Sequence, residues 1–410
     1  MNNSPLIRFH GYSNSWKNLK LKEHSKLITK GTTPKSKTIK GDINYIKVEN
    51  LRSGKIFVSS KISENDHFSF LKRSILHEGD ILFSIAGTLG RAAIVRKSIL
   101  PANTNQALAI IRGYNFNSTF LLTALSGKVV REYVQKNPTV GAQPNLSLEQ
   151  VGNLIISSPL IEEQNEIGIF FEKIDDTISL HQQELDALKQ TKKGFFQKMF
   201  PQEGQYTPLL RFNGFDGSWK TKNLGDVLES IYNGQTPSRD RKDFWNGQIN
   251  WLSSGELNRG IVKSTIEKIT KLGQSNSNLK IVPKNTFVIA ITGLEAAGTR
   301  GNCGILDIDT TLNQSCMALF PKKDLLDTTF LFQWYRKVGE KYGLRFTQGT
   351  KQQSYNAEII KKLEICLPSL DEQIQIGKFF KELDEVIELK EQELEALKNT
   401  KQGFLQKMFV

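Results

Sequence analysis

Residues 159–200 read PLIEEQNEIGIFFEKIDDTISLHQQELDALKQTKKGFFQKMF, and residues 368–409 read PSLDEQIQIGKFFKELDEVIELKEQELEALKNTKQGFLQKMF. The two segments align without a gap at an offset of 209 residues, and 24 of their 42 positions are identical. Chance does not produce such agreement, so the chain contains a tandem duplication. Two copies are too few for a stacked solenoid, and the duplication therefore predicts two similar halves.

Weaker matches outside these segments extend the duplication over the whole chain. The matching pairs are PLIRFHGYSNSWK with PLLRFNGFDGSWK, INYI with INWL, GTLGRAAIV with GTRGNCGIL, and Asn105-Gln106 with Asn313-Gln314. Their offsets drift by only a few residues, as loop insertions in one ancestral unit would make them. We divide the chain into four parts, which are residues 1–158, 159–200, 201–367 and 368–410.

Apolar residues within each copy recur at alternating intervals of four and three, which is the heptad pattern of paired helices. The predicted seam consists of Ile167, Phe171, Ile174, Ile178, Leu185 and Leu188 in the first copy and Ile376, Phe380, Leu383, Ile387, Leu394 and Leu397 in the second. A polar residue interrupts both series at the same place, His181 and Lys390, and we interpret both as register-setting or edge positions rather than ligands. Leu180 and Leu389 widen the stripe, so each helix is expected to pack on something else as well.

Each copy predicts one long helix that begins after Pro159 or Pro368. Gly194 and Gly403 either end these helices or open a final amphipathic turn, FFQKMF or FLQKMF. About 30 helical residues extend roughly 45 Å at a rise of 1.5 Å per residue. An antiparallel coiled coil between the two helices is the simplest way to bury both seams, and such a pair would act as a spacer. The alternative is that each helix binds a separate partner chain.

The segments between the helices predict short strands with turn signals between them. The strand patterns are INYIKV, KIFV, DILFSI, AAIV and ALAIIR in the first segment and INWL, GIV, TFVIAIT and MALF in the second. Helical patterns cover residues 118–136 and 328–343. The sequence therefore predicts an α+β protein, in which two mixed α/β domains with small twisted sheets are separated by two long helices.

Charge separates the four parts. The chain carries 55 Lys and Arg against 42 Asp and Glu, a formal net charge of +13. Residues 1–158 carry +13 and residues 201–367 carry +6, whereas each helical segment carries −3. Basic domains favour a polyanionic partner such as DNA or RNA. The acidic residues of the helices are interpreted as solvated faces, although that does not explain the alternation.

Polar loops lie between the predicted strands, and their side chains are of the types that bond to phosphates or base edges. The candidates in the first domain are Thr33, Lys35, Lys37, Arg52, Thr88, Arg91, Asn105, Gln106, Gln143 and Asn145. The candidates in the second domain are Gln235, Thr236, Arg239, Arg241, Arg259, Arg300, Asn302, Asn313, Gln314, Lys351, Gln352 and Gln353. Arg can bond guanine through two N–H groups, and Asn or Gln can bond adenine through two groups. The sequence leaves open which candidates contact phosphates and which contact bases.

Signatures of catalysis do not occur in the sequence. It contains no GxxxxGK[ST], HExxH, GxSxG or CxxC, and no [DN]PP[YF] of the kind that amino-methyltransferases use. The five histidines are scattered, and the three cysteines lack paired spacing, so neither a metal site nor a disulfide framework is expected. Because there is no signal-peptide pattern and no run of 18 apolar residues, we expect a cytoplasmic protein without a membrane anchor.

The duplicated helix motif P-x-x-[ED]-E-Q-x-x-I-G-x-F-F, following two basic domains, resembles the specificity subunits of bacterial type I restriction-modification systems. The resemblance covers the whole chain, and it includes the RF-x-G motifs, the GxTP pieces KGTTP and NGQTP, and GDILFSIAGTLGRAAIV. One departure is that Pro283-Lys284-Asn285 stands in the second domain where the first has Glu78-Gly79-Asp80.

The resemblance implies a non-catalytic recognition subunit. Each mixed domain would be a target recognition domain that reads one half of a split sequence in double-stranded DNA, with the helices setting the gap. Two modification subunits that bind S-adenosylmethionine would methylate adenine at N6, and restriction subunits would use ATP and magnesium. The chain itself would hold no cofactor. The alternatives are a stand-alone regulator that binds DNA or RNA and an enzyme with an unrecognised site.

Overall fold

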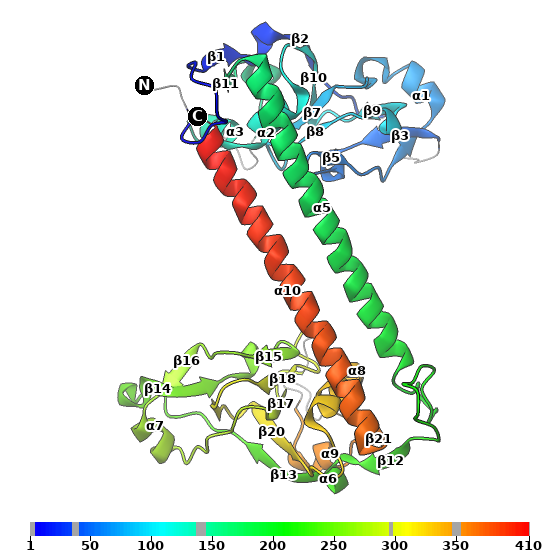
Figure 1. The fold of residues 1–410 in the computed structure, drawn as a ribbon, viewed down its shortest axis with the longest axis vertical. Helices are drawn as coiled ribbons and strands as arrows, with labels where there is room; N and C mark the ends of the chain where they lie inside the picture. Colours follow the sequence, from blue (N-terminus) through cyan, green and yellow to red (C-terminus); the bar gives the residue numbers. More distant parts are fainter. Residues whose placement is uncertain (1–4, 35–40, 137–144, 295–297, 347–353, 410) are drawn as a thin grey trace. The chain divides into compact units, whose positions relative to one another are not determined.

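The computed structural model describes residues 5–34, 41–136, 145–294, 298–346 and 354–409, which are drawn in colour in Figure 1. The chain forms two compact units. Unit 1 contains Met1–Glu184 and Glu391–Val410, and unit 2 contains Leu185–Lys390. Each unit therefore combines one mixed α/β domain with parts of both long helices.

The mixed domain of unit 1 is built around an antiparallel sheet with the strand order β2-β10-β7-β8. A second sheet has the order β6-β3-β9, in which β3 and β9 run parallel. Two antiparallel pairs, β1 with β11 and β4 with β5, complete the strands. The strands are β1 (Lys17–Lys20), β2 (Ser25–Lys30), β3 (Ile43–Ile46), β4 (Leu51–Arg52), β5 (Lys55–Ile56), β6 (Lys61–Ile62), β7 (Ile81–Ser84), β8 (Ala92–Ile94), β9 (Ala102–Thr104), β10 (Leu108–Tyr114) and β11 (Ile155–Ser158). The helices are α1 (Glu64–Phe68), α2 (Ser118–Ser126), α3 (Lys128–Lys136) and α4 (Leu148–Gly152), with 3-10 turns at η1 (Leu21–His24), η2 (Val48–Asn50), η3 (Lys72–Ser74) and η4 (Lys97–Ile99).

Both faces of the larger sheet in unit 1 are buried. Side chains alternate between the two faces along a strand. Ile81 and Phe83 of β7 pack in one core with Phe120 of α2. Leu82, which lies between them, packs in another core with Ile46 of the second sheet. This double burial explains why DILFSI reads as an almost continuous apolar run.

The mixed domain of unit 2 repeats this arrangement, with one more strand in its larger sheet. Its larger sheet has the order β13-β20-β17-β18-β15, and the smaller sheet has the order β16-β14-β19. β12 pairs with β21 as β1 pairs with β11. The strands are β12 (Lys220–Asn223), β13 (Leu228–Asn233), β14 (Trp245–Leu252), β15 (Gly260–Val262), β16 (Glu267–Ile269), β17 (Phe287–Ala290), β18 (Cys303–Leu306), β19 (Thr311–Leu312), β20 (Cys316–Pro321) and β21 (Glu364–Leu367). The helices are α6 (Leu224–Val227), α7 (Lys271–Asn276), α8 (Thr328–Phe346) and α9 (Ala357–Lys361), with 3-10 turns at η5 (Lys242–Phe244) and η6 (Ser254–Glu256).

The turn before β17 keeps the geometry of the turn before β7 although its sequence differs. Gly79 has a φ of 82°, and its N–H donates to the carbonyl of Val95 at 2.9 Å. Asn285 has a φ of 64°, and its N–H donates to the carbonyl of Leu306 at 2.6 Å. Glycine adopts this left-handed conformation freely, and asparagine tolerates it. The departure in sequence therefore leaves the turn intact.

The two long helices are longer than the sequence predicted. α5 (Ile161–Lys198) has 38 residues and α10 (Leu370–Met408) has 39, which is about 57 to 59 Å of helix. Both continue through Gly194 and Gly403, so of the two interpretations of these glycines the final helical turn is the correct one. The residues after each glycine keep the helix in place because they pack on a core. Phe195 and Phe196 contact the core of unit 2.

Within each unit the long helices run antiparallel. In unit 1 the ring centroids of Phe170 and Phe404 lie 4.9 Å apart, and further along α5 His181 lies 3.6 Å from Glu393. In unit 2 Lys192 bonds to Asp384, and the rings of Phe195 and Phe379 lie 5.1 Å apart. Residue numbers rise along α5 as they fall along α10, which confirms the predicted antiparallel pair.

Every residue of the proposed seam is buried or half-buried, from Ile167 to Leu188 and from Ile376 to Leu397. The residues that widen the stripe behave differently, since Leu180 is 56% exposed and Leu389 is 60% exposed. His181 lies at the edge of the pair, where its side chain is 25% exposed. None of the helices in the described residues is long and apolar enough to cross a membrane.

Candidate nucleic-acid interface

An arginine in each RF-x-G motif is bonded to the first turn of a long helix. Arg8 forms two bonds of 2.7 Å with the carboxylate of Glu163, and Arg211 forms two bonds of 2.7 Å with Glu372. Both carboxylates are almost fully buried, with side-chain exposures of 1% and 0%. The hydrogen bonds raise the pKa of Arg8 and of Arg211. These ion pairs fix the segment before each mixed domain to the helix that follows it.

The glutamine after each of these glutamates bonds to the mixed domain. Gln164 accepts the N–H of Asn117 at 3.0 Å, and Gln373 accepts the N–H of Asp327 at 3.0 Å. Asn117 and Asp327 each also accept an N–H from the first turn of a domain helix, α2 or α8. The start of each long helix is therefore joined to the start of a domain helix, by a glutamine that both copies share and by a cap that is asparagine in one copy and aspartate in the other.

An aromatic cluster in each unit includes the last phenylalanine of one helical segment. The rings are Trp16, Phe120, Phe171 and Phe409 in unit 1 and Trp219, Phe330, Phe380 and Phe200 in unit 2. Phe409 is 7% exposed and Phe200 is 2% exposed. The end of α10 thus packs against the mixed domain of unit 1, and the chain just after α5 packs against that of unit 2.

The predicted contact residues fall into two loop groups in each unit. The first loop group contains the GxTP loop (residues 31–34 or 234–237) and the Asn-Gln loop (Asn105-Gln106 or Asn313-Gln314). The second loop group contains the loop after β7 or β17, together with Arg52 and Asn145 in unit 1 and with Arg259 in unit 2. Six predicted residues lie outside the described residues, namely Lys35, Lys37, Gln143, Lys351, Gln352 and Gln353.

In both units the first loop group is closed by the same side-chain bond. The hydroxyl of Thr33 donates to the amide oxygen of Gln106, and the hydroxyl of Thr236 donates to that of Gln314. The partners are 73 and 78 residues apart in the sequence. Both glutamines are exposed. Two loops that the sequence suggested separately therefore form one surface in each unit.

The backbone explains why these loops meet. A Cβ atom on Gly31 would lie 2.2 Å from a carbonyl oxygen of the chain at the Asn-Gln loop, and one on Gly234 would lie 2.0 Å from such an oxygen. Only glycine permits this approach. Tyr45 and Trp251, at matching positions in β3 and β14, donate to GxTP-loop carbonyls at 2.9 and 3.1 Å. Burial raises the pKa of Tyr45 to about 12.

The asparagines of the Asn-Gln loops shape the turn. The Asn105 side-chain oxygen accepts the N–H of Ala107 at 3.3 Å, and that of Asn313 accepts the N–H of Ser315 at 3.1 Å. Asn313 is only 9% exposed. These bonds are of the type by which asparagine stabilises turns, and here they hold the glutamine next to each asparagine in place.

The second loop group of unit 1 carries exposed cations. Thr88 and Arg91 lie in the exposed loop after β7, which the hydroxyl of Ser84 closes by donating to the Thr88 carbonyl at 2.6 Å and accepting the Arg91 N–H at 2.8 Å. Asn145 joins the same loop through a β-bridge. Arg52 is exposed on β4, which lies beside β8.

In the second loop group of unit 2, the arginine side chains donate hydrogen bonds to backbone carbonyls of the protein itself. Arg259 donates to the carbonyl of Arg300 at 2.5 Å, and Arg300 donates to the carbonyl of Leu294 at 2.7 Å. Both arginines and Asn302 are half-buried. Backbone carbonyls therefore use part of the donor capacity of these arginines, which support the loop as well as supplying charge.

Two exposed arginines extend the first loop group of unit 2. Arg241 forms bonds of 2.9 and 2.6 Å with Asp243, and these bonds lower the pKa of that carboxyl. Arg239 forms a fork with Glu267 and stacks on Trp245. Gln235, which lies in the GxTP loop beside them, is also exposed.

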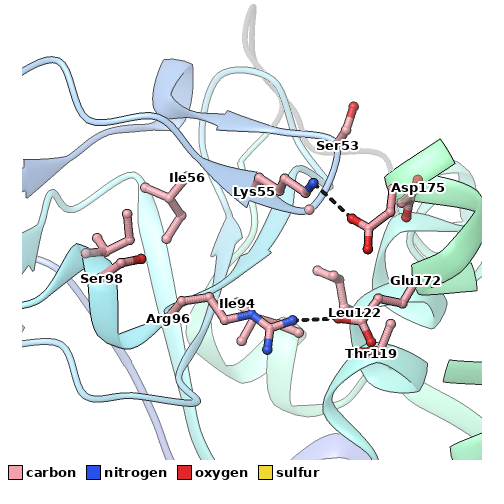
Figure 2. A pocket seen from close by; sticks show the side chains of 13 residues that line it. Ser53, Lys55, Ile56, Ile94, Arg96, Ser98, Thr119, Leu122, Glu172 and Asp175 are labelled. Atoms are coloured by element: carbon pink, nitrogen blue, oxygen red, sulfur yellow. Dashed lines mark hydrogen bonds and ion pairs between the residues drawn. The ribbon is translucent and has the colours of Figure 1, made fainter. Parts of the chain in front are cut away.

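A pocket of about 290 Å³ lies between the mixed domain of unit 1 and α5 (Figure 2). Lys55 bonds to Asp176 at 3.1 Å and Arg96 bonds to Glu172 at 2.9 Å across it. Lys55 and Arg96 are thus already paired with carboxylates, and these two ion pairs link the mixed domain to α5. In the described part of the chain no group of three or more His, Cys, Asp or Glu is placed to hold a metal ion.

The family model described as the type I restriction modification DNA specificity domain matches residues 13–190 and again residues 217–399. The chain belongs to this family. Each match contains one mixed domain and most of one long helix, so the specificity domain occurs twice, in step with the duplication.

Named specificity subunits resemble this chain along much or all of its length. The putative type I restriction enzyme MjaX specificity subunit of Methanocaldococcus jannaschii is 22% identical over an alignment of 412 positions, which covers 95% of this chain and 92% of the relative. The EcoR124I/EcoR124II specificity subunit of Escherichia coli is 27% identical over 179 residues, or 43% of either chain. The crystal structure of the type I S subunit from M. genitalium has the same fold, with a TM-score of 0.62 and 14% identity over 99% of both chains.

Several positioning residues of this specificity subunit were missed from the sequence. Lys55 and Lys263, which bond to a long helix in units 1 and 2, stand at an offset of 208 residues. Their recurrence was a usable signal. Glu267 and Trp245 had no such signal, because neither lies in a matching motif and their meeting with Arg239 depends on the pairing of β14 with β16.

Proposed function

We propose that this specificity subunit reads a two-part DNA sequence, with one half-site for each unit and a gap set by the paired helices. The observation that carries the proposal is the repeated first loop group, in which Thr33 with Gln106 and Thr236 with Gln314 form the same bond. Two equivalent surfaces in one chain suit two half-sites. The fixed attachment of each domain to its helix, through Glu163 and Glu372, suits a fixed gap.

The charge of the two mixed domains supports DNA phosphates as the common ligand. Each phosphate that a Lys or Arg neutralises releases counterions, so binding weakens as salt rises. With six to ten such contacts, raising salt from 50 to 200 mM is expected to weaken binding about 10³-fold to 10⁵-fold. Fluorescence anisotropy with a labelled duplex measures this slope. A change below about tenfold would contradict the two basic domains as the binding face.

We further propose that partner subunits supply the chemistry. Two modification subunits would bind S-adenosylmethionine and methylate adenine at N6, and restriction subunits would use ATP and magnesium, in the cytoplasm. Leu180 and Leu389, exposed at 56% and 60%, occupy equivalent positions in the two helix copies and would give each modification subunit an apolar contact.

A pair of substitutions tests this docking. Leu180→Asp or Leu389→Asp alone should lower the number of bound modification subunits from two to one, and the double variant should bind none. The mass of the purified complex measures this number. Gln183→Asp, which places the same charge at another exposed position of α5, is the control and should keep both. Two bound subunits in the double variant would contradict this docking surface.

The decisive experiment expresses the chain with the modification subunit of its own system in a host without adenine methylation. Long-read sequencing then maps N6-methyladenine. We expect one two-part motif with a fixed gap and one methylated adenine in each half. An intact complex that produces no new methylation would favour the alternative, a stand-alone DNA-binding or RNA-binding regulator.

A further inference from the structure

A three-residue cluster on the surface of unit 2 holds one arginine rigidly. The guanidinium carbon of Arg239 lies 3.8 Å from the ring centroid of Trp245. Both terminal nitrogens of Arg239 donate to the carboxylate of Glu267, one of them at 2.9 Å. The indole N–H of Trp245 donates to the carbonyl of Ser238 at 3.0 Å, which ties the tryptophan to the same loop. A planar cation is thus fixed by a ring below it and a carboxylate beside it.

The cluster leaves part of the guanidinium available for a ligand. A guanidinium carries five N–H donors in one plane, and the fork with Glu267 uses two of them. The Arg239 side chain remains 55% exposed. Guanine presents two acceptors, O6 and N7, side by side in the major groove, and two parallel N–H groups of one arginine match that spacing. Because its orientation is already fixed, such an arginine loses little conformational entropy on binding.

The cluster lies beside the first loop group, and the described residues of unit 1 contain no counterpart of it. Trp251, which holds the GxTP loop, packs edge-on against Trp245 with a centroid distance of 5.0 Å. Glu267 pairs with Trp251 across β16 and β14, and the residue at this place in unit 1 is Ser60, which pairs with Tyr45. Residues 238–248 contain two Arg and one Trp, whereas residues 35–42, between the matching motifs of unit 1, contain neither.

Residues that occur in both units and residues that occur in unit 2 suit different roles in DNA recognition. The bonds from Thr33 to Gln106 and from Thr236 to Gln314 are the same in both units, so they suit features that both half-sites share. A cluster that the described residues hold in unit 2 and not in unit 1 suits a base that one half-site alone contains. We propose that Arg239, positioned by Glu267 and Trp245, reads a guanine in the half-site of unit 2. This inference rests on the proposed function.

Methylation mapping of variants in complex with the modification subunit tests it. Arg239→Gln should lower the preference for guanine at one position of one half-site by about 10-fold to 100-fold, and the other half-site should not change. Glu267→Gln should weaken the preference at the same position. Lys361→Gln, which removes another exposed cation of unit 2, is the control and should leave the motif unchanged.

The outcomes separate this inference from the proposed function. A wild-type complex that yields no two-part motif contradicts the proposed function. The guanine reader alone is contradicted if the wild type yields a two-part motif and Arg239→Gln yields the same motif. It is also contradicted if Arg239→Gln loses methylation equally at every sequence.

A modified base gives a second readout that does not depend on the folding of a variant. In duplexes that carry 7-deazaguanine, the N7 acceptor is missing. The wild-type complex should bind at least about fivefold more weakly when the base read by Arg239 is replaced, and Arg239→Gln should bind both duplexes equally. Equal binding by the wild type at every guanine of that half-site, or a half-site without guanine, would overturn the proposal.

Discussion

Glu372 is a buried carboxylate that fixes the segment before the mixed domain of unit 2 to α10. It has no exposed surface, and its partner Arg211 is 15% exposed. Removing one partner of a buried ion pair leaves the other charge without compensation and costs about 3–5 kcal/mol. We expect Glu372→Ala to lower the free energy of unfolding of unit 2 by about 3 kcal/mol. Urea denaturation followed by tryptophan fluorescence measures this, because four of the five tryptophans lie in unit 2.

The control for this substitution removes an exposed carboxylate from the same unit. Glu358 pairs with Lys361 on α9, and its side chain is 71% exposed. Exposed pairs of this kind contribute little, so Glu358→Ala should change the free energy of unfolding by less than about 1 kcal/mol. Equal effects of the two substitutions would contradict the role of the buried pair.

Tyr45 makes unit 1 sensitive to alkaline pH. Burial raises its pKa from 10.0 to about 12, so the folded state keeps the phenol proton after the unfolded state has lost it. The corresponding stability is present below pH 10 and disappears as the pH rises toward 12. Tyr45→Phe removes the titrating group and the bond to the Thr32 carbonyl. The variant should be less stable by about 1 kcal/mol near neutral pH and should lose less stability on alkalinisation. Parallel declines in thermal unfolding temperature for both proteins would contradict this.

Glycines within one long helix have opposite roles. A Cβ atom on Gly168 would lie 2.5 Å from the side-chain oxygen of Asn117, which caps α2, whereas one on Gly194 would have no neighbour within 4 Å. Alanine favours a helix over glycine by up to about 1 kcal/mol. Gly194→Ala should therefore stabilise the protein by roughly that amount, and Gly168→Ala should destabilise it because the cap must move.

The two alanine variants serve as controls for each other, since both change the same residue type within α5. Thermal unfolding of both under one set of conditions measures the difference. A stabilising Gly168→Ala would show that the cap of α2 does not restrict the approach of the two helices.

The elements with local periodicity could be predicted from the sequence, and those without it could not. The heptads of α5 and α10 and the apolar runs of β7 and β17 indicate their structure by themselves. β1 and β12 read KNLK and KTKN, and only their pairing with β11 and β21 makes them strands. The sequence did not decide whether the helices end at Gly194 and Gly403, because a glycine facing open space does not stop a helix that packing continues to hold.

The same division applies to the candidate interface. Loop composition and the recurrence of motifs identified Thr33, Gln106, Thr236 and Gln314 as contact residues, which stay predictions. Each threonine meets its glutamine because backbone contacts join loops that lie more than 70 residues apart in the sequence. No local sequence pattern encodes such contacts. The cluster around Arg239 depends in addition on a strand register.

The whole molecule makes a prediction about the distance between half-sites. Residues 173–179 of α5 and 396–402 of α10 face each other, as the ion pair between Asp175 and Lys401 shows, and neither segment contains Leu180 or Leu389. Deleting both segments removes one heptad from each helix and keeps the seam in register. The helices become shorter by about 10.5 Å, or about three base pairs of DNA. Methylation mapping should show the same half-sites with a gap shorter by about three base pairs.

An unmatched deletion is the control for this prediction. Removing residues 173–179 alone shifts the seam of one helix against the other, so the protein should lose stability and methylation together. Altered half-sites with an unchanged gap in the matched deletion would contradict the role of the helices as a spacer.

The position of Phe409 in the core of unit 1 has a consequence for synthesis on the ribosome. Unit 2 is one continuous stretch of chain, whereas unit 1 needs Glu391–Val410, which is translated after all of unit 2. Domains usually fold in the order in which they leave the ribosome. Here the domain that emerges first is completed after the second, because Trp16 and Phe120 await Phe409 until all of unit 2 has been translated. A chain whose translation stops early would therefore carry a finished second domain and an open first one.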